Sequence, residues 1–454
     1  MKDEEIISNS LRQLALMIKK AINDSISSGI IQPEEEPYFR WKVDKFQYTD
    51  KGITESSAHS ENFMKKSWFR ATSKLKESIE KSNEYTLALE HLMNIFGESD
   101  KLSQNLKYFV QKLIYKYLSD SRFEEADRDS IIATFLKELR EEPIKYGAKV
   151  ELQGFALRPD SVEIGSDTTL RQPKIEDLER EYPVYIPMIL PHLPSPSVIL
   201  NIGFLGRRAN GIQRRVEQAI VILRLFRVGS VKWTSYHMHS ESIIDIMASG
   251  TLTAGKIDSP LETYLVTQED EQKLKKFWQT INDFMPRSFF ELSVTKTDYL
   301  TIAYNRYSDA LLQNGILERR IANATMGLEA LFLKPDERQE LVYRLRTRVS
   351  KLLGLLDYYL REIKKIINDA YRIRSIFVHG GQLSYNERKE LESKYKDIKN
   401  VLQSALDYLR ISIILMMLSN KEKDEFIDLI DESLTDTKQG ESLAQCIFEA
   451  KQMI

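Results

Sequence analysis

The sequence contains a single cysteine, Cys446, among its 454 residues. An internal disulfide is therefore excluded, and so is a zinc site built from several thiolates. Proteins that fold in a reducing compartment typically use cysteine this sparingly. The cytoplasm is therefore the expected location.

Long hydrophobic runs are also missing. The most apolar stretch, Ile411 to Leu418, falls well short of the ~20 residues that a membrane-spanning helix needs. The chain starts with acidic residues after Met1 and continues into an amphipathic pattern, which differs from the apolar core of a signal peptide. We therefore expect a soluble cytoplasmic protein with no membrane partner.

A large net charge is the third absence. The 65 Lys and Arg residues are balanced by 67 Asp and Glu residues, which leaves a formal net charge of −2. The molecule as a whole is no polycation, so any surface that binds nucleic acid has to be local.

Length and periodicity predict a mainly α protein of about three domains. A helical N-terminal region covers 1–146, a small α+β middle domain covers 147–290, and a C-terminal helical bundle covers 291–454. In the N-terminal region, apolar residues at helical spacing predict helices over 6–28, 63–82, 85–95, 102–118 and 122–139. The segment between the first two helices has no sustained period and is predicted to be a loop.

From Tyr146 onward the pattern alternates, which predicts short strands. We expect them near 150–157, 162–164 and 198–204, with an edge strand or loop at 184–190 and a helix over 212–226. Beyond residue 298 helical spacing returns, and it predicts helices over 299–313, 317–333, 338–356, 358–379, 386–418 and 421–433.

The predicted helix over 386–418 carries a heptad seam. Its apolar positions alternate at spacings of four and three, which suits a long contact with another helix of the same chain or of a second copy. The positions are Leu391, Tyr395, Ile398, Leu402, Ala405, Leu409, Ser412 and Met416.

A basic segment spans Arg207 to Lys232. Its seven cations face only Glu217 as a counter-charge within the segment. Such an excess can bind an RNA backbone, although a solvated helix face explains it more simply. The candidate RNA-binding residues are Arg207, Arg208, Arg214 and Arg215.

His237 and His239 alternate around Met238, so on a strand they point the same way. Two such histidines can ligate a metal, but no third ligand is evident nearby. We therefore predict no metal site and no cofactor.

The most informative stretch is Tyr371 to Gly381. The helix that leads into it has an apolar stripe at 363, 366, 367 and 370, and Arg374 continues that stripe. A guanidinium on a buried face has to meet an anion, either a carboxylate of the fold or a phosphate from outside. Gly380 and Gly381 are expected to end the helix, which leaves His379 in its last turn, where the ring can titrate near neutral pH.

A histidine beside a fixed cation is the minimum apparatus for cleaving RNA without a metal. The base removes the proton of the ribose 2′-hydroxyl, the oxygen attacks the adjacent phosphate, and the cation stabilises the developing charge. The sequence around the stretch offers neither a cluster of metal ligands nor a glycine-rich nucleotide loop. DNA lacks the 2′-hydroxyl and cannot react in this way.

The same residues resemble the Arg-x(4–6)-His motif of HEPN domains, because four residues separate Arg374 from His379 and six separate Arg372 from it. Around them, residues 300–435 resemble the Apea-like HEPN family. Four blocks occur in the family's order, at 306–311, 327–333, 341–349 and 374–380.

This resemblance implies a HEPN-type bundle that acts as a metal-independent endoribonuclease in antiviral defence or as a toxin. It implies that two motifs meet across a homodimer, with His379 as acid or base, Arg374 on the scissile phosphate and Arg372 as a second cation. Ser375 stands where many active members have Asn, Asp or His.

Two other readings remain open. The bundle can be a catalytically inactive HEPN module that binds RNA or a protein partner. Alternatively, Arg374 pairs with a carboxylate such as Glu329, which lies in an apolar run where an unpaired charge would be costly. That pair is compatible with catalysis, because a carboxylate behind Arg374 would hold the arginine in position.

Overall fold

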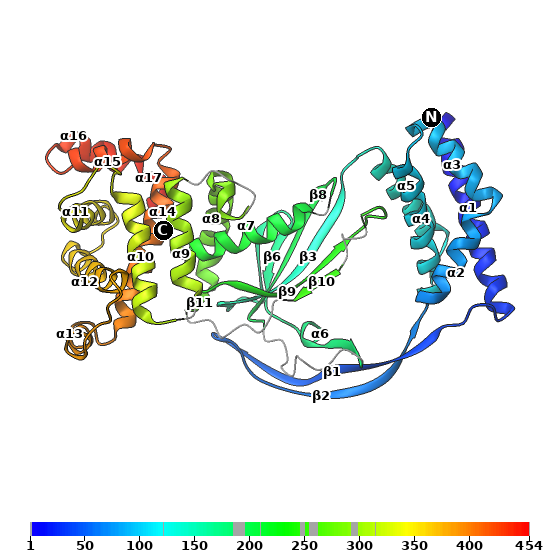
Figure 1. Ribbon diagram of the computed structural model, residues 1–454, viewed down its shortest axis with the longest axis horizontal. Coiled ribbons are helices and arrows are strands. Elements are labelled where there is room, and N and C mark those ends of the chain that lie inside the picture. The colour runs from blue at the N-terminus through cyan, green and yellow to red at the C-terminus, as the bar shows by residue number, and fades with distance from the viewer. Residues whose placement is uncertain are drawn as a thin grey trace.

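The computed structural model describes residues 2–120, 122–184, 196–208, 210–245, 250–253, 262–291, 298–313 and 315–453. The chain is mainly helical, as predicted, and every strand among these residues precedes residue 267 (Figure 1).

The N-terminal helices form a unit with its own hydrophobic core. Leu11, Leu14, Leu106 and Phe109 are fully buried in it. Helices α3 and α4 begin at serine caps; for example, the Ser99 hydroxyl accepts a hydrogen bond from the backbone N–H of the third residue of α4. The unit consists of α1 (Lys2–Ser27), α2 (Phe69–Glu80), α3 (Asn83–Phe96), α4 (Asp100–Ser119) and α5 (Glu125–Leu139).

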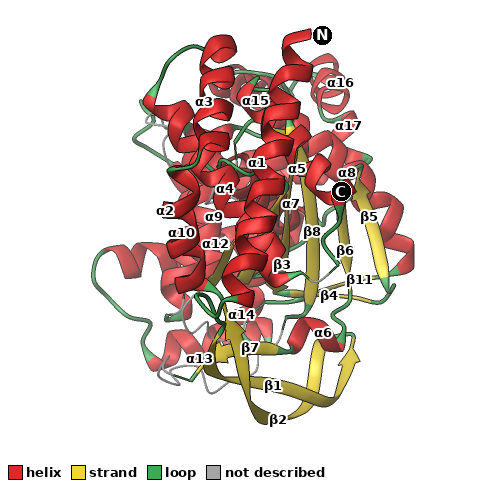
Figure 2. Ribbon diagram, turned by 90° about the vertical axis from the view of Figure 1, so that its right-hand side faces the viewer, coloured by secondary structure: helices red, strands yellow, loops and turns green. Residues whose placement is uncertain are grey.

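The predicted loop after α1 is wrong, because this segment is a long antiparallel hairpin of β1 (Glu34–Thr49) and β2 (Gly52–Ser67). The ribbon runs below the rest of the molecule in both views (Figures 1 and 2). Within it only Val43 and Gly52 are buried, so neither face shows the alternation that marks a half-buried strand. The Tyr48 hydroxyl anchors the tip, because it bonds to the backbone of Ser197 and of Leu157.

The middle of the chain forms a six-stranded sheet in the order β10-β9-β3-β8-β6-β5. Helix α7 (Asn210–Phe226) lies across it, and α8 (Glu271–Phe284) packs beside β5. The sheet strands are β3 (Ile144–Gln153), β5 (Ser161–Gly165), β6 (Thr168–Arg171), β8 (Val198–Gly206), β9 (Lys232–Ser240) and β10 (Gly250–Thr253).

Smaller elements join this region to its neighbours. They are β4 (Phe155–Leu157), α6 (Ile175–Leu178), β7 (Arg180–Pro183) and β11 (Tyr264–Val266), with single 3₁₀ turns at Gln268–Asp270 and Arg287–Phe289. Strand β7 pairs with β1, and β11 pairs with β4. The predicted edge strand or loop over 184–190 lies outside the described residues, apart from its first position.

The C-terminal part is a helical bundle around α14 (Ile398–Leu418), which contacts α9, α10, α11 and α12. By length and composition α14 could cross a membrane, but 78% of its most apolar window is buried inside the protein. The surrounding helices are α9 (Tyr299–Leu312), α10 (Leu317–Phe332), α11 (Leu341–Gly354), α12 (Leu360–Val378), α13 (Tyr385–Tyr395), α15 (Lys423–Glu432), α16 (Thr437–Cys446) and α17 (Phe448–Lys451).

The single helix predicted over 386–418 is wrong, because the chain breaks between α13 and α14. Lys396 adopts a left-handed conformation, with φ of 67°, and Asp397 caps α14 by accepting a hydrogen bond from the backbone N–H of Lys399. The seam positions from Leu402 to Met416 are buried within the same chain. The seam is therefore an internal contact.

The sheet and the bundle share one continuous hydrophobic core. At their junction the buried Arg410 of α14 donates from Nη1 to the carbonyl oxygens of Leu225 and Phe226, at 2.9 and 3.1 Å. Its Nη2 donates to Asp407 at 2.7 Å. A cation thus satisfies carbonyl groups that the last turn of α7 leaves unpaired.

Replacing Arg410 with Met should lower the free energy of unfolding by about 3–5 kcal/mol, because it leaves two carbonyl groups without a donor and Asp407 without its cation. Chemical denaturation followed by circular dichroism measures this loss. Arg319→Met, at an exposed position of α10, is the control and should change the value by less than about 0.5 kcal/mol. Equal effects of the two substitutions would show that the Arg410 contact contributes nothing specific.

Candidate functional site

Helix α12 carries the predicted site, and its buried face is the predicted one. Ile363, Ile366, Ile367 and Ala370 are at most 2% exposed. Arg374 follows one turn after Ala370, and its side chain is only 24% exposed. The apolar stripe therefore brings a guanidinium against the neighbouring helix, α10.

The anion that Arg374 meets is Glu329. Arg374 Nη2 donates to Glu329 Oε2 at 3.0 Å, which is the pairing that the sequence left open as one alternative. Burial raises the pKa of the Glu329 carboxyl group, and the charge of Arg374 opposes that rise. The Arg374 guanidinium also lies 5.5 Å from the centre of the Tyr371 ring.

Two structural features concern this pair: a donor that it leaves unused and the glycine that positions it. The Nε atom of Arg374 is buried and has no hydrogen-bond partner, so the guanidinium retains an unused donor. Gly327 sets the position of Glu329, because a Cβ atom there would lie 2.5 Å from Leu409 of α14. The glycine therefore lets α10 approach α14 closely, and Glu329 follows two residues later.

The helix ends as predicted. Gly380 is left-handed, with φ of 77°, and the backbone N–H groups of Gly380 and Gly381 donate to Phe377 and Ile376 at 3.0 and 2.9 Å. His379 is exposed at this end. Its ring has no hydrogen bond and no ion pair within the described residues.

The structure separates the two arginines. Arg374 faces α10, whereas Arg372 faces α13 and donates to Glu390 at 3.3 Å. At about 100° per residue, His379 lies roughly 140° around the helix from Arg374 but within roughly 20° of Arg372. Arg372 and His379 therefore lie on one side of α12, together with the half-buried Ser375, whereas Arg374 lies on another side.

In the structure, the basic segment from Arg207 to Lys232 has more acidic partners than the single Glu217 counted within the segment. Arg214 pairs with Glu291 at 2.6 Å, and Arg207 lies 3.8 Å from Glu141. These acids are distant in sequence, so a local count misses them.

The other cations of this segment have varied surroundings. Arg227 pairs with Asp270, and Arg215 lies over the Phe204 ring, 5.2 Å from its centre. Arg208 is exposed and has no partner among the residues that the structure describes. The proposed RNA-binding role of the four arginines therefore stays a prediction.

His237 and His239 lie on β9 and pair across the sheet with Lys149 and Gly147. His237 Nε2 is 3.5 Å from an oxygen of Glu151, which is fully buried. Sequence inspection missed Glu151, since it is more than 80 positions away. Within the described part of the chain, no group of three metal-ligating side chains comes together.

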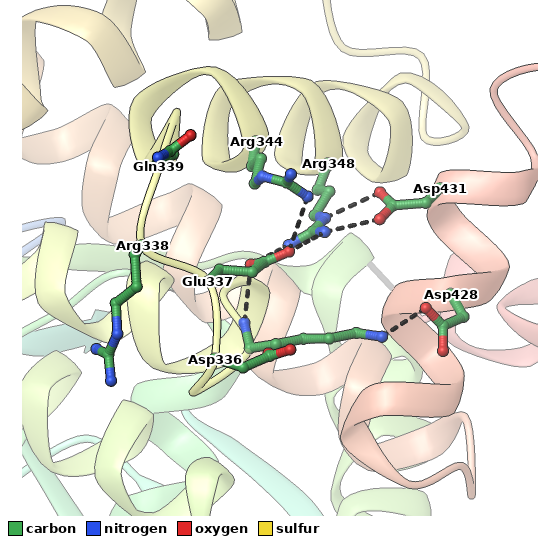
Figure 3. A pocket seen from close by; sticks show the side chains of 9 residues that line it. Asp336, Glu337, Arg338, Gln339, Arg344, Arg348, Asp428 and Asp431 are labelled. Carbon is green, nitrogen blue, oxygen red and sulfur yellow. Dashed lines mark hydrogen bonds and ion pairs between the residues drawn. The ribbon is translucent and has the colours of Figure 1, made fainter.

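A polar pocket of about 520 Å³ lies beside the start of α11 (Figure 3). Arg348 lies at its base, 2% exposed, between Glu337 and Asp431. It donates to both carboxylates at 2.6–2.9 Å and to the carbonyl oxygen of Phe332. This network joins the chain after α10 to α11 and α15. The ion pairs thus have a role in the fold, which accounts for the buried charges.

Comparison of the chain with protein-family models, with curated proteins and with solved structures found no match.

The Arg348 network predicts a dependence of stability on pH. The hydrogen bonds from Arg348 hold the pKa of Glu337 down to about 2, against the opposing effect of burial. A carboxyl group whose pKa is lower in the folded protein stabilises it above the unfolded pKa, and that contribution is lost as the pH falls.

We therefore expect Glu337→Gln to destabilise the protein at pH 7 and to flatten the fall in stability between about pH 5 and pH 2. Denaturant titrations across this range measure both effects. The exposed neighbour Asp336, replaced by Asn, is the control. An unchanged slope in Glu337→Gln would contradict the assignment.

Proposed function

We propose that the chain is a metal-independent endoribonuclease of HEPN type. In this proposal Arg374 binds the scissile phosphate and His379 transfers the proton. The observation that carries it is the position of Arg374, which Glu329 fixes through one nitrogen near the exposed end of α12 while the arginine side chain stays 24% exposed.

The chemistry needs only groups that this end of the bundle supplies. The His379 ring is open to solvent and can accept the proton of a ribose 2′-hydroxyl. Attack of that oxygen on the adjacent phosphorus forms a 2′,3′-cyclic phosphate and releases the 5′-oxygen of the next nucleotide, which takes up a proton. The guanidinium stabilises the charge on the phosphate oxygens.

Arg372 provides the attraction for RNA. Arg374 and Glu329 together carry no net charge, so this pair orients the phosphate but does not draw it in. Glu390, the partner of Arg372, is 55% exposed. An exposed ion pair contributes little to stability, so a phosphate can displace Glu390.

A second candidate function rests on the angle around α12. Because Arg374 and His379 of one chain lie on different sides of the helix, a single copy does not direct both at one phosphate. This favours the alternative of an inactive HEPN module that binds RNA or a protein partner. Ser375, which stands where many active members have Asn, Asp or His, favours it as well.

Wild-type protein should cleave RNA in the presence of EDTA and leave 2′,3′-cyclic phosphate ends, because no step requires a metal. His379→Ala and Arg374→Ala should each abolish cleavage, since one removes the base and the other the cation. Gel analysis of a defined RNA, with mass spectrometry of the product ends, measures this.

Arg361→Ala is the matched control, because Arg361 is an exposed arginine at the other end of α12. Circular dichroism checks that every variant is folded. Cleavage by His379→Ala at the wild-type rate would reject the nuclease assignment and favour the inactive module.

The proposal includes a homodimer in which two copies of His379 face one shared cleft. The seam of α14 is buried within the chain, so the contact has to involve other surfaces, and the exposed end of α12 has to take part. A dimer resolves the angular problem, because Arg374 of one copy and His379 of the other can reach the same phosphate.

Mixed dimers test this arrangement. Arg374→Ala and His379→Ala chains with different affinity tags are co-expressed and purified on both tags in turn. The mixed dimer keeps one Arg374 and one His379, so it should cleave RNA where each variant alone does not. Failure to recover a doubly tagged species, or a doubly tagged species without activity, would refute the shared cleft.

A further inference from the structure

A second pocket, of about 530 Å³, lies at the opposite end of the molecule from α12. It forms where the base of the β1–β2 hairpin meets α2, α4 and the chain after β9 (Figure 1). Its volume falls within the range of small-molecule binding sites, roughly 300–1,000 Å³.

One stripe of α4 forms a wall of this pocket. Tyr108, Lys112, Tyr115 and Ser119 follow at spacings of four, three and four, so they lie on one side of the helix. The opposite side of α4 packs into the N-terminal core through residues such as Leu106 and Phe109. The pocket stripe is therefore not needed for the packing of α4 against its neighbours.

Aromatic rings dominate the apolar part of the lining. Tyr38 comes from the hairpin, Trp68 directly precedes α2, and Tyr108 and Tyr115 come from α4. Tyr115 is 57% exposed, and Trp68 and Tyr108 are partly exposed. Partly exposed rings from three elements around one cavity offer planar faces on which a flat ligand can stack.

Two cations in the lining have no direct ion-pair partner. Neither Lys66 nor Lys112 forms an ion pair with any residue in the described ranges. Lys65, by contrast, is bound to Glu181 and lies over the Tyr38 ring.

Lys112 is held in unfavourable surroundings. Burial lowers the pKa of Lys112, the charge of Lys116, one turn along α4, adds to this effect, and the charge of Glu138 opposes it without cancelling it. Like charges four residues apart on a helix destabilise it. A bound anion would relieve both costs.

The start of α2 adds to the positive field of the pocket. No side chain caps this helix, and its first turn contains no acidic residue. Thr72 and Ser73 near this end belong to the lining. The positive end of the helix dipole thus acts together with the two lysines.

We propose that this pocket binds a nucleoside phosphate, with the base stacked on the aromatic rings and the phosphate held by Lys66 and Lys112. Glu36 and Asp245 in the same lining can accept hydrogen bonds from base N–H groups or ribose hydroxyls. The nucleotide is either free or the 5′-phosphorylated end of an RNA strand. The proposal is independent of the nuclease site.

Isothermal titration of the full-length protein with AMP, GMP, CMP and UMP tests the proposal. At least one nucleotide should bind, and Lys112→Gln and Tyr108→Leu should each weaken that binding about tenfold, because one removes a charged contact and the other a stacking surface. Lys101→Gln, at an exposed position of the same helix outside the pocket, should bind like wild type.

Further titrations identify what the pocket recognises. Inorganic phosphate alone and adenosine alone should bind more weakly than the nucleotide, since each keeps only half of the contacts. Tighter binding of a 5′-phosphorylated trinucleotide than of the mononucleotide supports an RNA end, and equal binding supports a free nucleotide. Absence of binding by all four nucleotides at millimolar concentration, unchanged affinity in both pocket variants, or equal affinity for phosphate alone would overturn the proposal.

Discussion

The buried cation of Arg410 is the contact on which the arrangement of this molecule depends. An α-helix leaves its last carbonyl groups without partners, and α7 ends inside the protein. Arg410 satisfies the carbonyl groups of Leu225 and Phe226, while Asp407 balances its charge. The Tyr307 hydroxyl donates to the carbonyl oxygen of Arg224 in the same turn. The sheet and the bundle are therefore joined by directional bonds as well as by a shared apolar core, which fixes α14 and the helices around it.

The candidate site follows from that fixed position of α14. Gly327 allows α10 to lie close against α14, and this approach brings Glu329 to the buried face of α12. Arg374 then finds a carboxylate at the one position where the apolar stripe would otherwise contain an unpaired charge. The pair neutralises a buried charge, and in the proposed nuclease it would also orient a phosphate. Activity of the His379 variant separates the two roles, because His379 is exposed and its loss should leave the fold intact.

The sequence predicted those features whose cause is local or periodic. The stripe of α12, the left-handed Gly380 and the Arg374–Glu329 pair follow from spacing, from glycine conformation and from the cost of a buried charge. The hairpin at 34–67 escaped prediction because neither of its faces is buried, so its residues do not alternate. The break at Lys396 escaped because no glycine or proline marks it, although Asp397 is a recognisable helix cap. The counter-charges of Arg207 and Arg214 come from Glu141 and Glu291, which no local count includes.

Charge pairing also explains why the unpaired cations are informative. In a chain with a net charge of −2, most buried or half-buried cations can find a carboxylate, as Arg348 and Arg227 do. A lysine that stays half-buried without a direct ion pair, such as Lys112, has a cost that the charge of Glu138 offsets only in part. Arg374 differs, since Glu329 balances its charge. An anion bound at Lys112 would therefore mainly neutralise the charge of the lysine, whereas an anion bound at Arg374 would mainly be oriented by the arginine. The first effect should weaken steeply with added salt, and the second should not.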